Sequence, residues 1–106
     1  MLDGVYSVRQ ASRGEDLFLA VCSQCHGPNE FSGARFRVRW QGQTVGDIYE
    51  FVSTMMPDED PGSLEDLEYA DVVAYMLSLN RYPTGAADLP PDQASLDGVR
   101  IEPTSP

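Results

Sequence analysis

The residues of this chain best suited to chemistry lie together as Cys22, Cys25 and His26, in the order Cys-x-x-Cys-His. This spacing is the attachment signature of a c-type haem. Each thiol adds to a vinyl group of the porphyrin, and the imidazole that follows is then carried under the iron as the proximal ligand. The chain has two Cys and one His, so the motif uses all of them. We therefore predict one covalently attached haem c, with His26 as an iron ligand.

Three other kinds of site contain Cys-x-x-Cys. A redox-active disulfide is expected in a βαβ context, which the sequence pattern does not indicate. A structural zinc site needs four Cys or His ligands, and this chain offers three. A structural disulfide across two residues would close a tight, strained ring. The haem interpretation is favoured over all three.

A second axial ligand is expected from Met56, which lies in Met55-Met56-Pro57 at the end of an apolar periodic segment. Methionine sulfur is a soft ligand that favours ferrous iron, so His/Met coordination suits electron transfer. A methionine at helical spacing is otherwise a core residue, which is our interpretation of Met76. Pro57 ends the helix and would present the neighbouring thioether from a loop. Met56 is thus the favoured ligand and Met55 the alternative.

Several strings together resemble a class I c-type cytochrome, in particular the small bacterial monohaem cytochromes associated with quinoprotein or other dehydrogenases. The resemblance covers residues 6–82 and implies an all-α fold with three main helices around the covalently bound haem. The strings that carry it are Arg13-Gly14-Glu15-Asp16-Leu17-Phe18, the haem motif, Arg39-Trp40, Met56-Pro57, Pro61-Gly62-Ser63-Leu64 and Glu68-Tyr69-Ala70-Asp71-Val72-Val73-Ala74-Tyr75.

The resemblance also implies roles for three more cofactor-binding residues. Trp40 would pack beside the haem and donate its indole N–H to a propionate. Arg39, or Arg37, would pair with the same anions. The carbonyl of Pro28 would accept the free N–H of His26 and so fix the orientation of that ring. The alternative for residues 35–41 is an exposed basic strand with one core tryptophan.

Apolar periodicity and capping residues predict the helices. Ser7, with Gln10 three residues later, begins the first helix, Thr44 the second and Ser63 the third, which ends near Asn80. Residues 35–41 alternate arginine with apolar residues, which predicts extended chain.

Gly14 interrupts the first helix, where glycine costs about 1 kcal/mol relative to alanine. By resemblance, the first and third helices cross there, with Gly14 and Phe18 facing Val72 and Tyr75.

We divide the chain into a cytochrome c domain, residues 1–83, and a proline-rich C-terminal tail or linker, residues 84–106. Five of the eight prolines lie from Pro83 onward. Leu96, Val99 and Ile101 are the residues of this tail best suited to dock on the body.

The chain is acidic, with seven Arg and no Lys against seventeen Asp and Glu, and a net charge of −10. This balance argues against nucleic acid or an anionic membrane as a partner. It favours redox partner proteins with basic surfaces. No run approaches the apolar length of a membrane span. Because c-type haem is attached outside the cytoplasm in this family, we expect a bacterial periplasmic or otherwise extracytoplasmic protein, with an export signal that is not in this sequence.

The sequence therefore predicts a single-haem electron-transfer protein with no catalysis of its own. It would move one electron from a dehydrogenase donor to an oxidase or cytochrome acceptor, as a free protein or as a domain of a longer chain. The alternative is a gas-binding or peroxidase-like haem protein with a labile sixth ligand. Met56-Pro57 argues against that alternative, and so does the lack of a second His for oxygen chemistry.

Overall fold

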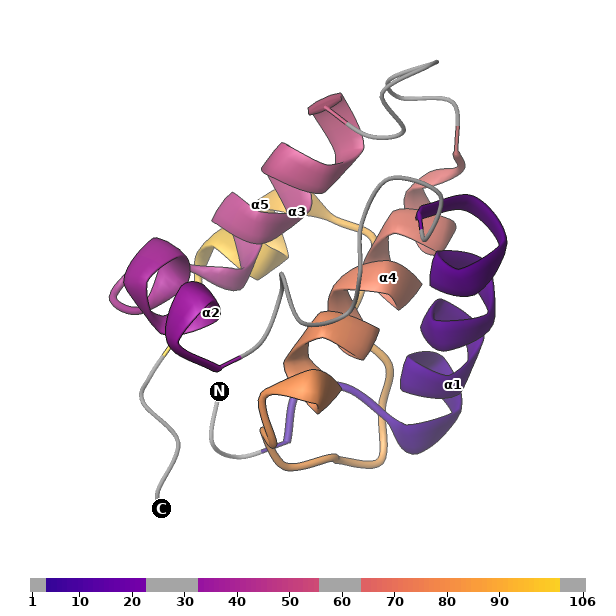
Figure 1. Cartoon of the computed structure of the whole chain (residues 1–106), viewed down its shortest axis with the longest axis horizontal. Coiled ribbons are helices and arrows are strands. Elements are labelled where there is room, and N and C mark those ends of the chain that lie inside the picture. The colour runs from indigo at the N-terminus through magenta and orange to yellow at the C-terminus, as the bar shows by residue number, and fades with distance from the viewer. Residues whose placement is uncertain (1–3, 23–32, 56–63, 102–106) are drawn as a thin grey trace.

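The computed structural model describes residues 4–22, 33–55 and 64–101. Over these ranges the chain is helical, which confirms the all-α prediction (Figure 1). The only β pairing in these ranges is one isolated antiparallel bridge between Thr44 and Arg100. The elements are α1 Val8–Leu17, the π-helical turn η1 Phe18–Cys22, α2 Gly33–Trp40, α3 Val45–Met55, α4 Asp66–Leu79 and α5 Gln93–Asp97.

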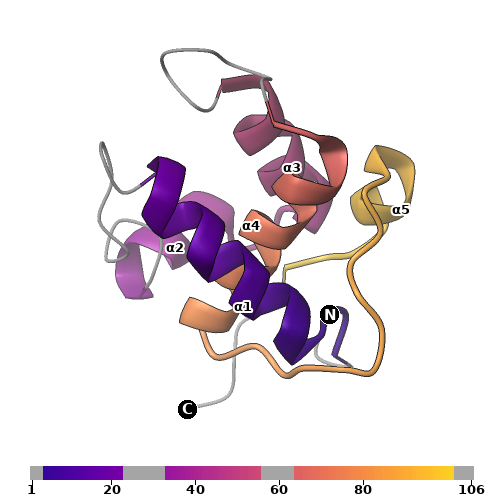
Figure 2. The same ribbon diagram turned by 90° about the vertical axis from the view of Figure 1, so that its right-hand side faces the viewer.

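The predicted crossing of the first and third long helices is confirmed. Helix α1 lies across α4, as Figure 2 shows. A Cβ on Gly14 would lie 1.9 Å from the carbonyl oxygen of Asp71, so only glycine allows this approach. Beside the crossing, the rings of Phe18 and Tyr75 pack with their centroids 5.4 Å apart.

Side chains cap α1 and α3, the first two helices that the sequence predicts, at the predicted residues. The Ser7 hydroxyl accepts the backbone N–H of Gln10 at 3.1 Å. At the start of α3, the Asp47 N–H donates to Thr44 Oγ1 at 3.1 Å, and the Thr44 N–H donates to Asp47 Oδ2 at 2.9 Å. These two reciprocal bonds form a complete capping box.

The predicted start of the third helix is wrong by two residues. The N-cap of α4 is Glu65, whose backbone N–H donates to the Glu68 carboxylate at 3.0 Å. Ser63 lies outside the described residues. Two glutamates three residues apart can form the same pair of reciprocal hydrogen bonds as a serine and a glutamate. The sequence therefore contains two overlapping helix-start signals, one at Ser63 and one at Glu65.

The expectation of extended chain at residues 35–41 is also wrong, because α2 covers Gly33–Trp40. Phe36 and Trp40 are both buried and lie four residues apart, the spacing of one helix face. Arg37, Val38 and Arg39 are exposed between them. In a short alternating segment, apolar residues are spaced both two and four residues apart, so the pattern fits a strand as well as a helix. Burial of one helix face favours the helix here.

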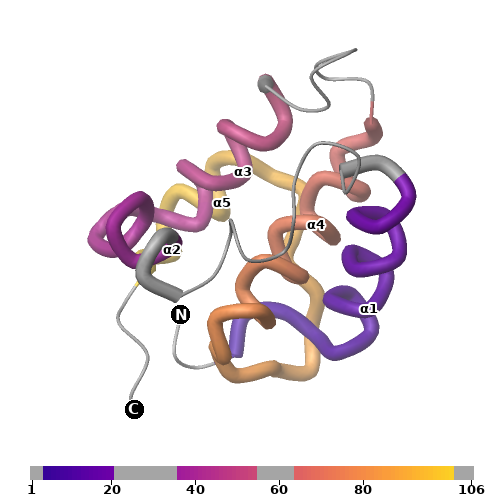
Figure 3. The backbone as a smooth tube through the Cα atoms, in the orientation of Figure 1, coloured from indigo at the N-terminus to yellow at the C-terminus, as the bar shows by residue number. Residues whose placement is uncertain are grey.

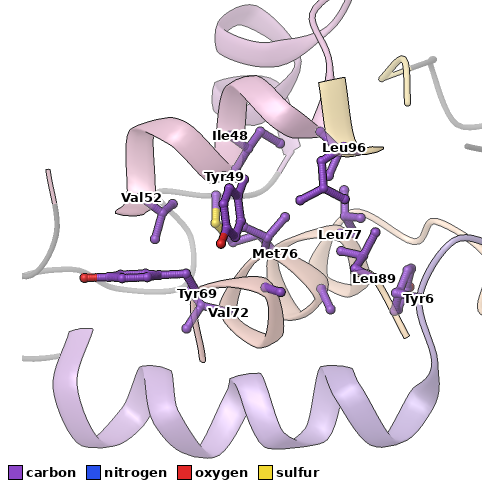
Figure 4. Close-up of a cluster of buried hydrophobic side chains, with 14 of the residues drawn as sticks. Tyr6, Ile48, Tyr49, Val52, Tyr69, Val72, Met76, Leu77, Leu89 and Leu96 are labelled. Atoms are coloured by element: carbon purple, nitrogen blue, oxygen red, sulfur yellow. The ribbon is translucent and has the colours of Figure 1, made fainter. Parts of the chain in front are cut away.

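The core lies between α3, α4 and the C-terminal segment (Figure 4). Helix α4 is buried around almost its whole circumference from Tyr69 to Leu77. Met76 is 2% exposed, which confirms its prediction as a core residue. Leu67, near the start of this helix, is half exposed. None of the helices within the described ranges is long and apolar enough to cross a membrane.

Candidate haem site

The structure describes part of the predicted haem site. Cys22 is the last residue of η1, and Arg39 and Trp40 are the last two residues of α2. Met55 ends α3, so the favoured methionine ligand directly follows that helix in the sequence. The predicted site residues that lie outside the described residues are Cys25, His26, Pro28 and Met56.

Trp40 is held where α2 meets α3. Its side chain is 6% exposed, and the ring meets Phe51 of α3 edge-on, with centroids 5.7 Å apart at an interplanar angle of 65°. Edge-to-face pairs of this kind add about 0.5–1.5 kcal/mol beyond the area that they bury. The contact fixes the indole relative to the helix that leads to Met56.

Arg39 lies on this aromatic pair. Its guanidinium carbon is 5.0 Å from the Trp40 ring centroid and 5.1 Å from that of Phe51. The Gln43 amide donates to the Arg39 carbonyl at 2.6 Å and closes the end of α2. A cation over aromatic rings gains about 0.5–1 kcal/mol at an exposed site. The guanidinium is therefore restrained while it keeps donors for an anion.

The structure thus brings together two residues that the sequence proposes for the propionates. Each carries an N–H donor, one on a neutral ring and one on a cation, which is the chemistry that a carboxylate requires. Phe51 is the third member of this group and was not predicted, because an apolar residue in a helical segment indicates only a core position. Nothing in the local pattern marks it otherwise.

Two tyrosines bond beside the segment that holds Met56: Tyr49 connects the described residues on its two sides, and Tyr69 bonds within the part that follows it. The Tyr49 hydroxyl of α3 donates to the Asp66 carbonyl at 3.4 Å. The Tyr69 hydroxyl of α4 accepts the Leu64 N–H at 3.2 Å. Burial raises the pKa of Tyr49, and the charge of Asp66 adds to the shift, so this phenol stays protonated and able to donate. Helices α3 and α4 are therefore joined close to the ends of the segment that holds the candidate ligand.

The donor set fits a c-type haem. Two thiols and an imidazole follow within five residues, beginning at the end of η1, and they suffice for two thioether bonds and one axial nitrogen. Trp40 and Arg39 add the two donors on α2.

Comparison with known proteins supports this assignment. The family model described as "Cytochrome C oxidase, cbb3-type, subunit III" matches residues 9–76, which is more than half of the chain. The matched range includes the Cys-x-x-Cys-His motif, Trp40 and Met56, and it ends within α4. Comparison with curated proteins and with solved structures gave no match.

Proposed function

Because this chain belongs to the family of c-type cytochrome domains described as cytochrome c oxidase, cbb3-type, subunit III, we propose that it is a single-haem electron carrier with His26 and Met56 as its iron ligands. Membership makes it a class I c-type cytochrome with a covalently attached haem c, and a haem-based electron-transfer protein. The observation that carries the proposal is the single Cys-x-x-Cys-His motif inside the matched range.

When bound, the haem supplies an iron that alternates between the ferrous and ferric states, one electron at a time. In the proposal, Cys22 and Cys25 anchor the porphyrin covalently. His26 would bind the iron, and the Pro28 carbonyl would orient its ring. The Met56 sulfur would be the second iron ligand, and as a soft, neutral ligand it would stabilise the ferrous form.

Two residues of α2 would hold the propionates. The Trp40 N–H would donate to one carboxylate, and the Arg39 guanidinium would place a positive charge beside it. Their contacts with Phe51 support this role, since they restrain both donors before any anion arrives. A positive charge near the haem also favours the ferrous state, because ferrous iron carries one positive charge fewer.

Redox partner proteins follow from family membership, and we propose a dehydrogenase donor and an oxidase or cytochrome acceptor. The net charge of −10 favours partner surfaces that are basic at the contact. We place the reaction outside the cytoplasm, as expected for a covalently attached haem. The chain acts as a carrier in this proposal and not as an enzyme.

The optical spectrum of the haem-loaded protein tests the proposal. We expect a low-spin spectrum in both oxidation states, the weak ferric band of methionine–iron ligation, and no response of the ferrous protein to carbon monoxide. Met56→Ala should abolish the band, whereas the adjacent Met55→Ala should retain it. Ready carbon monoxide binding by the unmodified protein would contradict His/Met ligation and favour a gas-binding or peroxidase-like protein.

A further inference from the structure

Residues 85–101, here termed the C-terminal strap, extend beyond the part of the chain that the family model matches. The strap leaves the end of α4, runs beside the start of α1, and then crosses to α3, where it forms α5 (Figures 2 and 3). Leu89, Leu96 and Ile101 are each at most 1% exposed. A segment with three fully buried side chains is a part of the folded body.

The first half of the strap is bonded to α1. The side chain of Gln10, itself 0% exposed, donates from Nε2 to the Leu89 carbonyl at 3.1 Å, and its Oε1 accepts the Leu89 N–H at 2.7 Å. One residue earlier, the Asp88 carboxylate accepts from Arg13 at 2.7 Å and from the Ser7 hydroxyl. Buried reciprocal bonds of this kind fix the strap in one register on α1.

The second half of the strap is bonded to the start of α3. The Val45 N–H, an amide that no turn of the helix can satisfy, donates to the Val99 carbonyl at 2.7 Å. The Ile101 N–H donates to the Gln43 carbonyl at 2.8 Å, and the Ile101 carbonyl accepts the Gly42 N–H at 3.1 Å. The strap therefore supplies a backbone partner for the first amide of α3 and pairs with the turn that precedes this helix.

Helix α5 also lies directly against the backbone of α3. A Cβ on Gly46 would lie 2.0 Å from Asp97 Oδ1 and 2.6 Å from the Asp97 backbone nitrogen. The Gln93 amide bridges the same place, since it donates to the Gly46 carbonyl at 2.8 Å and to Asp97 Oδ1 at 2.7 Å. The nearest backbone atom is farther away than the one at Gly14, but it is still too close for a Cβ, so glycine is required here for packing and not for its backbone angles.

The strap thus joins two helices that lead to opposite iron ligands. Helix α1 continues through η1 into the haem motif, and α3 ends immediately before Met56. We propose that the strap, through Gln93, Asp97 and Val99, positions α3 so that Met56 reaches the iron. This inference rests on the His/Met ligation proposed above, and it makes these three positioning residues.

The two axial ligands differ in how they are held, which makes the sixth position sensitive to the strap. On the His26 side, two thioether bonds keep the porphyrin attached to its own segment of chain. On the other side, Met56 would be held without a covalent bond to the porphyrin, through α3 and the chain that joins it to α4, and displacements of about 1 Å are enough to loosen a ligand. Loosening α3 should therefore release Met56 well before it unfolds the protein.

Carbon monoxide binding to the ferrous haem-loaded protein tests the proposal, because carbon monoxide competes with Met56 for the iron. Gly46→Ala must push α5 away from α3, and we expect it to raise the carbon monoxide affinity about tenfold or more and to weaken the ferric methionine band. Gln93→Ala removes one bridging side chain without a clash, so it should fold readily and shift both signals in the same direction by less.

Two controls separate positioning from general destabilisation. Gly98→Ala changes a strap glycine at which a Cβ has ordinary room, 3.6 Å from the Ser95 carbonyl oxygen, and it should leave carbon monoxide affinity unchanged. Ala11→Gly weakens α1 at a site away from α3. At equal loss of unfolding free energy, Ala11→Gly should bind carbon monoxide less tightly than Gln93→Ala.

Two results would overturn the proposal, and they are distinguishable. If Gly46→Ala and Gln93→Ala bind carbon monoxide no more tightly than Ala11→Gly, the strap only stabilises the fold, and the His/Met ligation stands. If the unmodified protein lacks the methionine band and binds carbon monoxide readily, the His/Met ligation fails and the positioning role fails with it.

Discussion

The guanidinium of Arg39 is restrained by its aromatic neighbours, and in the proposed site it would bind an anion. Its guanidinium lies over two rings, Trp40 from its own helix and Phe51 from the next. The rings hold the planar cation by its face, so its edge keeps N–H donors free of the stack. Lysine, with a compact and strongly hydrated charge, would gain less from this platform.

We predict that Arg39→Gln lowers the midpoint potential of the haem. In the proposed site Arg39 lies beside a propionate, so removing its positive charge would stabilise the ferric state relative to the ferrous one. We expect a decrease on the order of tens of millivolts, since about 59 mV corresponds to a tenfold change for a one-electron couple. Potentiometric titration of the haem-loaded protein measures the shift.

Arg37→Gln is the matched control, because it removes the same charge from the same helix at an exposed site away from the two rings. It should lower the potential by clearly less than Arg39→Gln. Equal shifts in the two variants would contradict a propionate contact specific to Arg39, and a larger shift in Arg37→Gln would assign the contact to Arg37, the alternative partner.

Among the helices, the crossing of α1 and α4 depends on one missing side chain. Gly14 places its Cα so close to Asp71 that a methyl group would overlap the carbonyl oxygen. A carbonyl within helix α4 cannot move without disturbing that helix. Nearby, Arg13 donates from Nε to Asp71 Oδ2 at 3.1 Å and from a terminal nitrogen to Oδ1 at 3.2 Å, which fixes the rotation of the two helices.

Gly14→Ala should therefore destabilise the protein although alanine favours helix by about 1 kcal/mol. Separating the two helices sacrifices packing along the whole contact, and we expect a net loss of about 2–4 kcal/mol in the free energy of unfolding. Denaturant titration followed by circular dichroism gives this value. Gly98→Ala, where a Cβ has room, should change it by no more than about 0.5 kcal/mol. Similar stability of the two variants would disprove the tight crossing.

The sequence predicts these elements where the signal is local. Ser7 and Thr44 each have a bonding partner within three residues, so both helix starts are visible as short patterns. Leu96 and Ile101 of the strap, two residues expected to dock on the body, are buried. The attachment of the strap to α1 is not visible in the sequence, because the bond between Gln10 and Leu89 spans 79 residues and leaves no pattern at either end. Gln10 in particular predicts a capping-box partner for Ser7, yet its side chain bonds to the strap instead.

The same distinction applies to the haem site. Cys-x-x-Cys-His is a fixed covalent pattern, so its residues can be named from the sequence alone. The contact between Trp40 and Phe51 arises only when α2 folds back on α3, and an alternating segment did not reveal even the type of secondary structure. Pro28 and Met56 lie outside the described residues, and their roles stay predictions.

Over the whole molecule, the net negative charge opposes the compact fold, whereas one small hydrogen-bond network around Asp88 stabilises it. A net charge of −10 creates repulsion that acid relieves. Asp88 has the opposite dependence. The Ser7 hydroxyl and then the Arg13 guanidinium hold the pKa of this carboxyl below its usual value of 3.8, since both favour the charged form. The strap is therefore attached to α1 partly by a carboxylate that must stay ionised.

The sign of the resulting pH dependence follows from linkage. Because folding lowers the pKa of Asp88, the unfolded chain binds its proton more readily than the native protein does. The contribution to stability is complete above the ordinary pKa near 3.8 and is lost as pH falls through the lowered value. Since the Asp88 side chain is 41% exposed, solvent screening limits this contribution to less than about 1 kcal/mol.

We predict that Asp88→Asn is less stable than the unmodified protein at pH 6, and that the difference vanishes as the pH falls below the lowered pKa. Asparagine keeps a hydrogen-bonding group beside Ser7 but has no charge for Arg13. Denaturant titration of the haem-loaded protein across this pH range measures the difference. Asp16→Asn changes the net charge equally at an exposed position of α1 and serves as the reference. If both variants differ from the unmodified protein by the same amount at every pH, the relief of repulsion accounts for the pH dependence, and the Asp88 attachment of the strap contributes nothing.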